Sequence, residues 1–179
     1  MPTSSLNPYV VKGEKMKKHP ERKPLRLKGY DYSNSGAYFI TICTKNREEL
    51  LSEICPNVGD DAHIVPNNRL TDYGKICEKY INNINEKYND ATVDKYVIMP
   101  NHIHLIIFLH GTMWASSPTQ TIGSIIRSFK TMVTKETGTA VWQRSFHDHI
   151  IRNEKDYAKI WEYIDNNPGI WETDCLYNK

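Results

Sequence analysis

The sequence predicts an α+β domain in which helices pack on one face of a mostly antiparallel sheet. The predicted elements follow one another as strand, helix, strand, strand, helix, strand and helix along the 179 residues. Strand segments are rich in β-branched and aromatic residues, whereas helix segments repeat apolar residues every three to four positions. One segment, His102–Leu109, is apolar on both faces, which is typical of a central strand covered on both sides.

Four extended segments are predicted, at Ala37–Thr44, Val93–Met99, His102–Leu109 and Phe146–Arg152. Gly36 precedes the first of them, and Pro100-Asn101 joins the two central ones. Residues 55–69 are rich in Pro, Asn, Gly and Asp, and His63–Val65 is the only candidate strand among them.

Three helices are predicted, from Thr71 to about Tyr88, from Thr121 to about Thr137, and from Asn153 to Pro168. Thr71 and Asn153 are typical N-cap residues, and Pro168 ends the last helix because the residue before a proline is disfavoured in helical geometry. Apolar periodicity predicts three buried stripes: Tyr73, Ile76, Tyr80, Ile84 and Tyr88; Ile122, Ile125, Ile126, Phe129 and Val133; and Tyr157, Ile160, Trp161 and Ile164.

The charge is distributed unevenly along the chain. Residues 1–30 carry eight Lys or Arg against two Glu, while the remainder carries fifteen basic and nineteen acidic residues. We expect residues 1–24 to form a flexible basic arm before a single domain at 25–179. The cations that would follow the phosphates of a polyanion are Lys12, Lys15, Lys17, Lys18, Arg22, Lys23, Arg26 and Lys28, joined by Arg127 and Lys130 on the outer face of the second helix. A merely solubilising tail is the alternative reading of the arm.

Composition narrows the class of protein. The apolar runs are too short to cross a bilayer, and the N-terminus lacks the apolar segment of a signal peptide. The four cysteines show no close pair, so neither a zinc knuckle nor a disulfide framework is indicated. A reduced, cytoplasmic location without membrane partners is therefore expected.

His102 and His104 are the candidate chemical centre. Residues two apart in a strand point to the same face, so both imidazoles project together. In the last helix, Tyr163 and Asn167 lie one turn apart and off the buried stripe. If that helix lies along the sheet, two imidazoles and one amide oxygen would suit Mn²⁺ or Mg²⁺ bridging a phosphate, with Zn²⁺ or Co²⁺ also possible. The structural alternative is a pair of hydrogen-bonded histidines, a capping asparagine and a surface tyrosine.

The run Met99-Pro-Asn-His-Ile-His-Leu-Ile-Ile107 resembles the histidine–hydrophobe–histidine (HUH) motif of single-tyrosine HUH transposases. The surrounding sequence resembles the REP-associated tyrosine transposase branch of that superfamily. The similarity extends through Arg26–Tyr32, Tyr38–Ile42, Leu70–Ile76, Trp142–Phe146, His149–Asn153, Tyr163–Pro168 and Trp171. It covers nearly the whole chain beyond the arm.

The resemblance implies a ferredoxin-like (RRM-like) fold and roles for the site residues. Tyr163 would be the nucleophile, with His102 and His104 as ligands of Mg²⁺ or Mn²⁺ and Asn167 as the third ligand. The implied activity is cleavage and rejoining of single-stranded or hairpin DNA through a 5′-phosphotyrosine, by a monomer or a homodimer.

Three other readings stay open at this point. The chain would be a non-catalytic binder of DNA hairpins if the motif has lost its activity. A histidine-motif hydrolase of small nucleotides would need a third histidine at position 106, which is isoleucine. His147 and His149 form a second pair two residues apart, and four histidines on neighbouring strands would make a closed zinc site. We expect His149 to be structural and His147 to be incidental.

Overall fold

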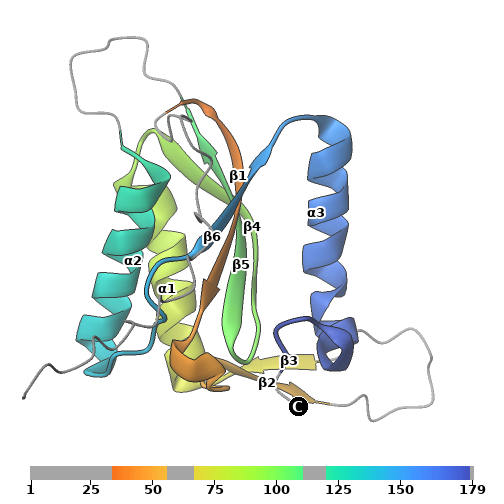
Figure 1. The fold of residues 1–179 in the computed structure, drawn as a ribbon. Helices are drawn as coiled ribbons and strands as arrows, with labels where there is room; N and C mark the ends of the chain where they lie inside the picture. Colours follow the sequence, from red (N-terminus) through yellow and green to blue (C-terminus); the bar gives the residue numbers. More distant parts are fainter. Residues whose placement is uncertain (1–33, 56–66, 111–119, 178–179) are drawn as a thin grey trace, which may run out of the picture.

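The computed structural model describes residues 34–55, 67–110 and 120–177. Four antiparallel strands form the main sheet in the order β4-β5-β1-β6, and β2 and β3 form a separate two-stranded ribbon (Figure 1). The strands are β1 (Gly36–Cys43), β2 (Ser52–Cys55), β3 (Asn67–Leu70), β4 (Ala91–Ile98), β5 (His102–Leu109) and β6 (His147–Ile151). The helices are α1 (Asp72–Lys87), α2 (Ile122–Thr137) and α3 (Glu154–Asn166), with short 3₁₀ turns η1 (Lys45–Arg47) and η2 (Asn167–Thr173).

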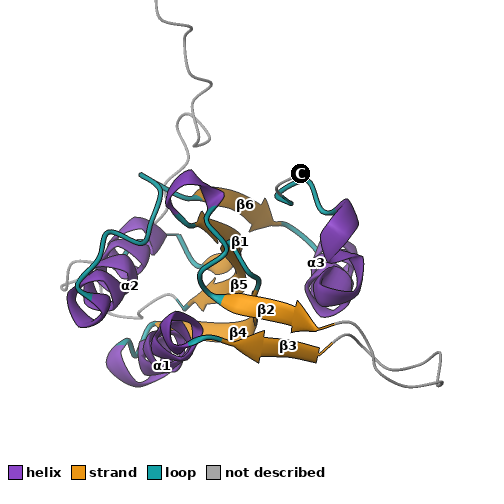
Figure 2. Cartoon of the chain, turned by 90° about the horizontal axis from the view of Figure 1, so that it is seen from below, coloured by secondary structure: helices purple, strands orange, loops and turns teal. Residues whose placement is uncertain are grey.

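The order β1-α1-β4-β5-α2-β6 with this strand arrangement is the ferredoxin-like pattern, so the predicted fold class is confirmed. The placement of one helix differs from the prediction. α1 and α2 lie together on one face of the sheet, whereas α3 lies on the opposite face (Figures 1 and 2). The physical reason lies in the central strand: β5 is buried on both faces, so both faces need a covering layer.

The main apolar core lies between the sheet and the α1–α2 layer. The predicted stripe of α2 is confirmed, because Ile122, Ile125, Ile126, Phe129 and Val133 are all buried. The predicted stripe of α1 is confirmed in part: Ile84 is buried and the other members pack against the core, but the line of fully buried residues is displaced from the stripe by about one residue. The buried positions of this helix are Gly74, Cys77, Ile81 and Ile84, while Tyr73, Ile76 and Tyr80 are only partly buried at the edge of the core.

The rotation of α1 has a steric cause. A Cβ atom added at Gly74 would lie 2.0 Å from the carbonyl oxygen of Leu51, so the helix approaches that backbone more closely than a side chain allows. The tyrosines stay at the rim, where their hydroxyls bond to polar groups: Tyr80 donates to Glu136, and Tyr73 pairs with Thr139. Gly74 therefore sits at the close approach to Leu51, Cys77, Ile81 and Ile84 are buried in the core, and the amphipathic tyrosines line its edge.

The helix starts follow the sequence closely. The side chains of Thr71, Thr121 and Asn153 each accept a hydrogen bond from the backbone N–H three residues later, as N-cap residues do. The ribbon of β2 and β3 was not predicted, because Asn67-Asn-Arg-Leu70 has little β propensity. Ser52 and Asn68 side chains donate to the Ile98 carbonyl and tie the ribbon to the end of β4.

Some predictions fall outside the described part of the chain. The candidate strand His63–Val65 and the basic arm at residues 1–24 lie in ranges that the structure does not describe, so the domain boundary stays a prediction. Among the residues that are described, no helix has the length and apolar character required to span a bilayer.

Candidate active site

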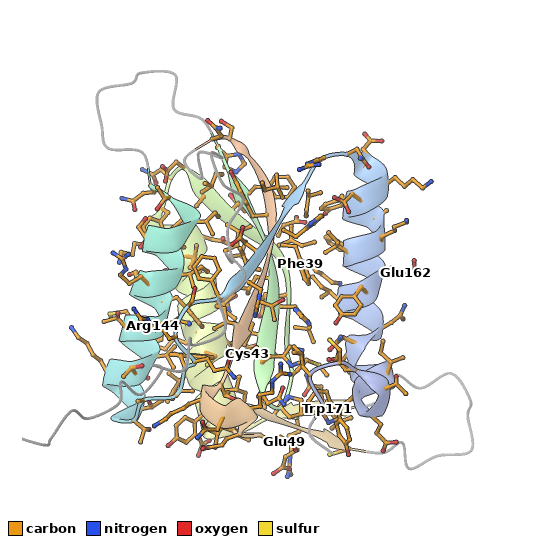
Figure 3. All side chains as sticks on the ribbon, in the orientation of Figure 1. Phe39, Cys43, Glu49, Arg144, Glu162 and Trp171 are labelled. Atoms are coloured by element: carbon orange, nitrogen blue, oxygen red, sulfur yellow. The ribbon has the colours of Figure 1, made fainter. Side chains whose placement is uncertain are left out.

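His102 and His104 lie on the face of β5 that is turned towards α3, and both are buried. The neighbouring strand β1 supplies their surroundings, since Thr41 is paired with His104 in the register of the two strands. The ring of Phe39 stacks on His104 with centroids 5.1 Å apart, and Trp171 packs beside His102 at 5.8 Å. Figure 3 shows Phe39 and Trp171 on the side of the sheet that faces α3.

Hydrogen bonds orient both imidazoles. The Asn101 side-chain amide donates to the carbonyl of Leu176 at 2.9 Å, which turns its Oδ1 towards Nδ1 of His102 at 2.8 Å. Nδ1 of His102 therefore carries the proton, and Nε2 keeps its lone pair. Nδ1 of His104 lies 2.9 Å from the hydroxyl of Thr41, so its Nε2 also faces the site. Such partners orient the rings of metal-binding histidines.

Burial keeps the two imidazoles neutral. It lowers the pKa of His102 to about 4, and the charge of Arg47 acts in the same direction. Burial, with the neighbouring His102, lowers the pKa of His104 to about 3. At neutral pH both rings thus present free lone pairs, the form that binds metal.

Tyr163 projects from α3 towards this pair. Its hydroxyl oxygen lies 3.3 Å from Nε2 of His104 and donates a hydrogen bond to Oδ2 of Asp174 at 3.0 Å. Partial burial raises the pKa of Tyr163, and the nearby charge of Asp174 and the hydrogen bond to it raise it further. The phenol is therefore held protonated at a fixed position beside the histidines.

Asn167 is fully buried at the end of α3, and its amide donates to Oδ2 of Asp174 at 3.0 Å. Tyr163 and Asn167, which the sequence placed one helical turn apart, thus both donate a hydrogen bond to the carboxylate of Asp174. Burial opposes the charge of Asp174, but hydrogen bonds from the Leu176 N–H, Asn167 and Tyr163 hold the pKa of Asp174 below its ordinary value.

Sequence reasoning missed Asp174. It follows Pro168, where helical periodicity ends, so no spacing rule relates it to Tyr163 or to the histidines. An acidic residue within a few positions of the helix that carries Tyr163 is a weak signal, because exposed acidic residues are common in such segments. The relation becomes visible only when the chain turns back after α3.

The site has donor atoms suited to a divalent metal. One ligand atom each from His102, His104 and Asp174 lies within 4.8 Å of the others. Nε2 of His102 and Oδ1 of Asn167 are buried without a hydrogen-bond partner in the protein. Unpaired buried acceptors are costly, and a bound cation would satisfy both of them. The residues present therefore fit the metal that the sequence predicted.

Comparison with known proteins gives the family. The sequence model described as "Transposase IS200 like" matches residues 32–167. The chain belongs to this transposase family. The resemblance read from the HUH motif is thereby confirmed.

Two relatives from Haemophilus influenzae are similar to this chain. One, an uncharacterized protein, is 40% identical over 176 residues, covering 87% of this chain and 93% of the relative. The other, named as a REP-associated tyrosine transposase, is 29% identical over 147 residues, covering 77% of this chain and 73% of the relative. A solved REP-associated tyrosine transposase, described as bound to a REP hairpin, shares the fold with a TM-score of 0.58 at 23% identity. That match covers 80% of this chain and 73% of the solved one.

The second histidine pair of this transposase lies apart from the first. β6 pairs with β1, so one strand separates it from β5. His147 and His149 are exposed, and Nε2 of His149 bonds to Asp156 at 2.9 Å. Within the described ranges, no cluster of four histidines forms, and the closed zinc site is thus contradicted.

Of the two predicted DNA-contacting residues on α2, one lies where it was expected and the other does not. Arg127 is exposed on α2 as expected. Lys130 does not lie on the outer face, because its ammonium group donates to the carbonyls of Gln143 and Ser145. Burial lowers the pKa of Lys130 to about 8. The cations of the arm and of its junction, Lys12, Lys15, Lys17, Lys18, Arg22, Lys23, Arg26 and Lys28, lie outside the described residues, and their role stays a prediction.

Proposed function

We propose that this transposase nicks and rejoins single-stranded DNA beside a hairpin, with Tyr163 as the nucleophile. The observation that carries the proposal is the position of the phenol oxygen, 3.3 Å from Nε2 of His104, within a buried histidine pair. A tyrosine with no role in the chemistry would not need to lie beside two buried histidines. A nucleophile must lie close to the atoms that bind the metal.

A divalent metal, Mg²⁺ or Mn²⁺, held by His102, His104 and Asn167 would polarise the scissile phosphate as a Lewis acid. The protein's own residues fix the position of the nucleophile: the hydroxyl of Tyr163 donates to Asp174 and lies 3.3 Å from Nε2 of His104. Tyr163 forms a bond from its oxygen to phosphorus and loses its proton, while the bond from phosphorus to the 3′ oxygen breaks and that oxygen takes up a proton. The phosphotyrosine link conserves the energy of the broken bond, so rejoining needs no nucleotide cofactor.

Two lines support hairpin DNA as the partner. A protein of the same fold was solved bound to a REP hairpin, and the N-terminal arm of this chain carries the cations that phosphate binding requires. The non-catalytic alternative is disfavoured because the tyrosine, both histidines and Asn167 come together in one arrangement. A protein that only binds DNA has no use for the unpaired Nε2 of His102.

The arrangement also bears on the oligomeric state. Tyr163 and His104 meet within one chain, so the site is complete without a tyrosine helix from a second copy. We therefore propose cleavage in cis, by a monomer or by a homodimer whose two sites act separately. Mixing Tyr163→Phe protein with His104→Ala protein tests this point: cleavage in cis predicts no recovered adduct.

The principal test is covalent adduct formation. Labelled hairpin DNA with a single-stranded flank is incubated with Mn²⁺ and resolved on a denaturing gel. Wild-type protein should give a protein–DNA adduct, and Tyr163→Phe should give none while binding the hairpin within a few-fold of wild type. Tyr157→Phe is the matched control, because Tyr157 is also a partly buried tyrosine of α3 but bonds to Asp94 instead. Adduct in the Tyr163→Phe protein would refute the assignment, and tight binding by wild type without adduct would favour the non-catalytic reading.

A further inference from the structure

The segment after α3 brings a carboxylate back to the histidines. Its backbone is fixed by several contacts. Trp171 is 7% exposed and packs against His102, while Tyr177 packs edge-on against Trp171 with ring centroids 5.1 Å apart. The Leu176 carbonyl accepts from Asn101, and the Leu176 N–H donates to Oδ1 of Asp174 at 2.6 Å. Asp174 is therefore built into the site and is not a chance acidic residue on the surface.

The family match ends at residue 167, so Asp174 lies beyond the part of the chain that the family pattern describes. The HUH motif and the tyrosine helix supply only neutral groups to the site: two imidazoles, one phenol and one amide. Among the described residues that cluster at the site, Asp174, in the segment after α3, supplies the negative charge.

From this geometry we propose that Asp174 is an anionic ligand of the catalytic metal, alongside His102, His104 and Asn167. The proposal rests on the proposed function, since it concerns the metal of the same site. The ligand atoms of His102, His104 and Asp174 lie within 4.8 Å of one another, a separation that one ion with bonds of about 2.0–2.2 Å can close with small side-chain movements. The two unpaired acceptors, on His102 and Asn167, line the same site.

Ligand chemistry explains what the carboxylate would add. Nitrogen ligands alone suit Zn²⁺, Cu²⁺ or Ni²⁺, whereas carboxylate and amide oxygens shift the preference towards Mg²⁺ and Mn²⁺. One negative charge also offsets part of the charge of the ion in a buried site. Asp174 would thus decide both the affinity and the kind of metal that the site retains.

The first experiment is calorimetric titration of the full-length, DNA-free protein with Mn²⁺. Asp174→Asn removes the charge but keeps an oxygen that can still accept from Asn167 and Tyr163. We expect it to weaken Mn²⁺ binding by about tenfold or more. Glu172→Gln is the matched control, because Glu172 is exposed on the same segment and its substitution removes the same charge. It should change the affinity less than about twofold, in line with the small effect of an exposed charge.

The second measurement needs no variant and is independent of whether Asp174→Asn folds. Of the proposed ligands only Asp174 carries a carboxylate, so Mg²⁺ bound at this site should shift one carboxylate band among those of the 21 Asp and Glu side chains in the infrared difference spectrum of wild-type protein. A shift of carboxylate stretching bands is expected, and the Glu172→Gln protein should show the same shift.

Unchanged Mn²⁺ affinity in folded Asp174→Asn protein, or no carboxylate shift in wild type, would overturn the inference. These failures differ from a failure of the proposed function. Wild type that forms adduct while Asp174→Asn binds Mn²⁺ normally would remove only the role of Asp174. Wild type that binds Mn²⁺ through Asp174 but never forms adduct would remove only the reaction. Wild type that binds no divalent metal would remove both.

Discussion

The two faces of β5 differ in character: one carries apolar residues of the core, and the other carries the two histidines. Ile103, Leu105, Ile107 and Leu109 point into the core under α1 and α2, while His102 and His104 point towards α3. The cover differs as well: α2 contributes five buried residues, and α3 contributes Ile164 as its one buried residue. The first face is packed for stability, and the second is packed to hold polar groups in place.

This contrast shows how a small domain supports a buried polar site. Packing of the apolar face fixes the backbone of β5. The histidines are held in place because they alternate along the same strand with these packed residues. α3 relies more on polar and aromatic contacts at its rim, including an ion pair between Lys95 and Asp165 and the ammonium of Lys95 lying 4.5 Å from the centre of the Trp161 ring. Substitutions on the two faces should therefore separate stability from chemistry.

The largest expected difference is between two adjacent residues. Leu105→Ala should lower the free energy of unfolding by about 3–4 kcal/mol, because it leaves a cavity in the core on the α1–α2 face. His104→Ala should change stability much less at neutral pH but should abolish adduct formation and weaken Mn²⁺ binding. Urea unfolding and adduct yield per folded molecule measure the two effects. Similar stability losses for both variants would contradict the division of labour between the faces.

Between pH 7 and pH 5, acidification should act mainly through the two buried histidines of the α3 face. The pKa of His102 is lowered to about 4 and that of His104 to about 3, so between those values and about 6.5 the unfolded chain binds more protons than the folded one. Stability is thus lost as the pH falls through about 6.5, by an amount on the order of 4 kcal/mol at pH 5 for the two rings together in metal-free protein. His104→Ala should show about half of this loss in urea titrations at pH 7 and 5. An equal loss in both proteins would mean that other groups dominate.

Gly74→Ala tests the packing of α1 against the backbone of Leu51, at a distance from the histidine face of β5. The added methyl group would meet the Leu51 carbonyl at 2.0 Å, and the backbone there cannot yield as a flexible side chain does. We expect a loss of about 1–3 kcal/mol in unfolding free energy, the usual range for overpacking. The yield of adduct per folded molecule should stay near that of wild type. A large fall in the adduct yield per folded molecule would show that packing on the α1–α2 face affects the histidine face.

The smallest effect should come from the charges outside both faces. Deleting residues 1–24 removes six cations, so the fall of single-strand DNA affinity with salt should become shallower by roughly 0.7 log units per decade for each lost phosphate contact. Arg127→Ala should reduce the slope by at most one such contact. Binding titrations at three salt concentrations give the slopes. A slope unchanged by the deletion would assign the arm to solubility only.

Periodicity and capping predicted the elements that local chemistry decides. The caps at Thr71, Thr121 and Asn153 and the paired histidines of β5 all follow from short-range rules. The prediction failed where distant backbone segments decide the outcome. The rotation of α1 depends on Leu51, and the position of Lys130 depends on two carbonyls in the loop that follows α2. Asp174 reaches the site only because the chain reverses after Pro168, which no local pattern records.

The order of the two faces along the chain sets the order in which they are assembled during synthesis. The core on the α1–α2 face is built mainly from residues between Gly36 and Val141, whereas Tyr163 and Asp174 come after Asn153. Domains emerge from the ribosome from the N-terminal side, at about 5–20 residues per second. His102 and His104 are therefore synthesised before Tyr163 and Asp174, and the polar site is completed only when the segment after α3 has been made.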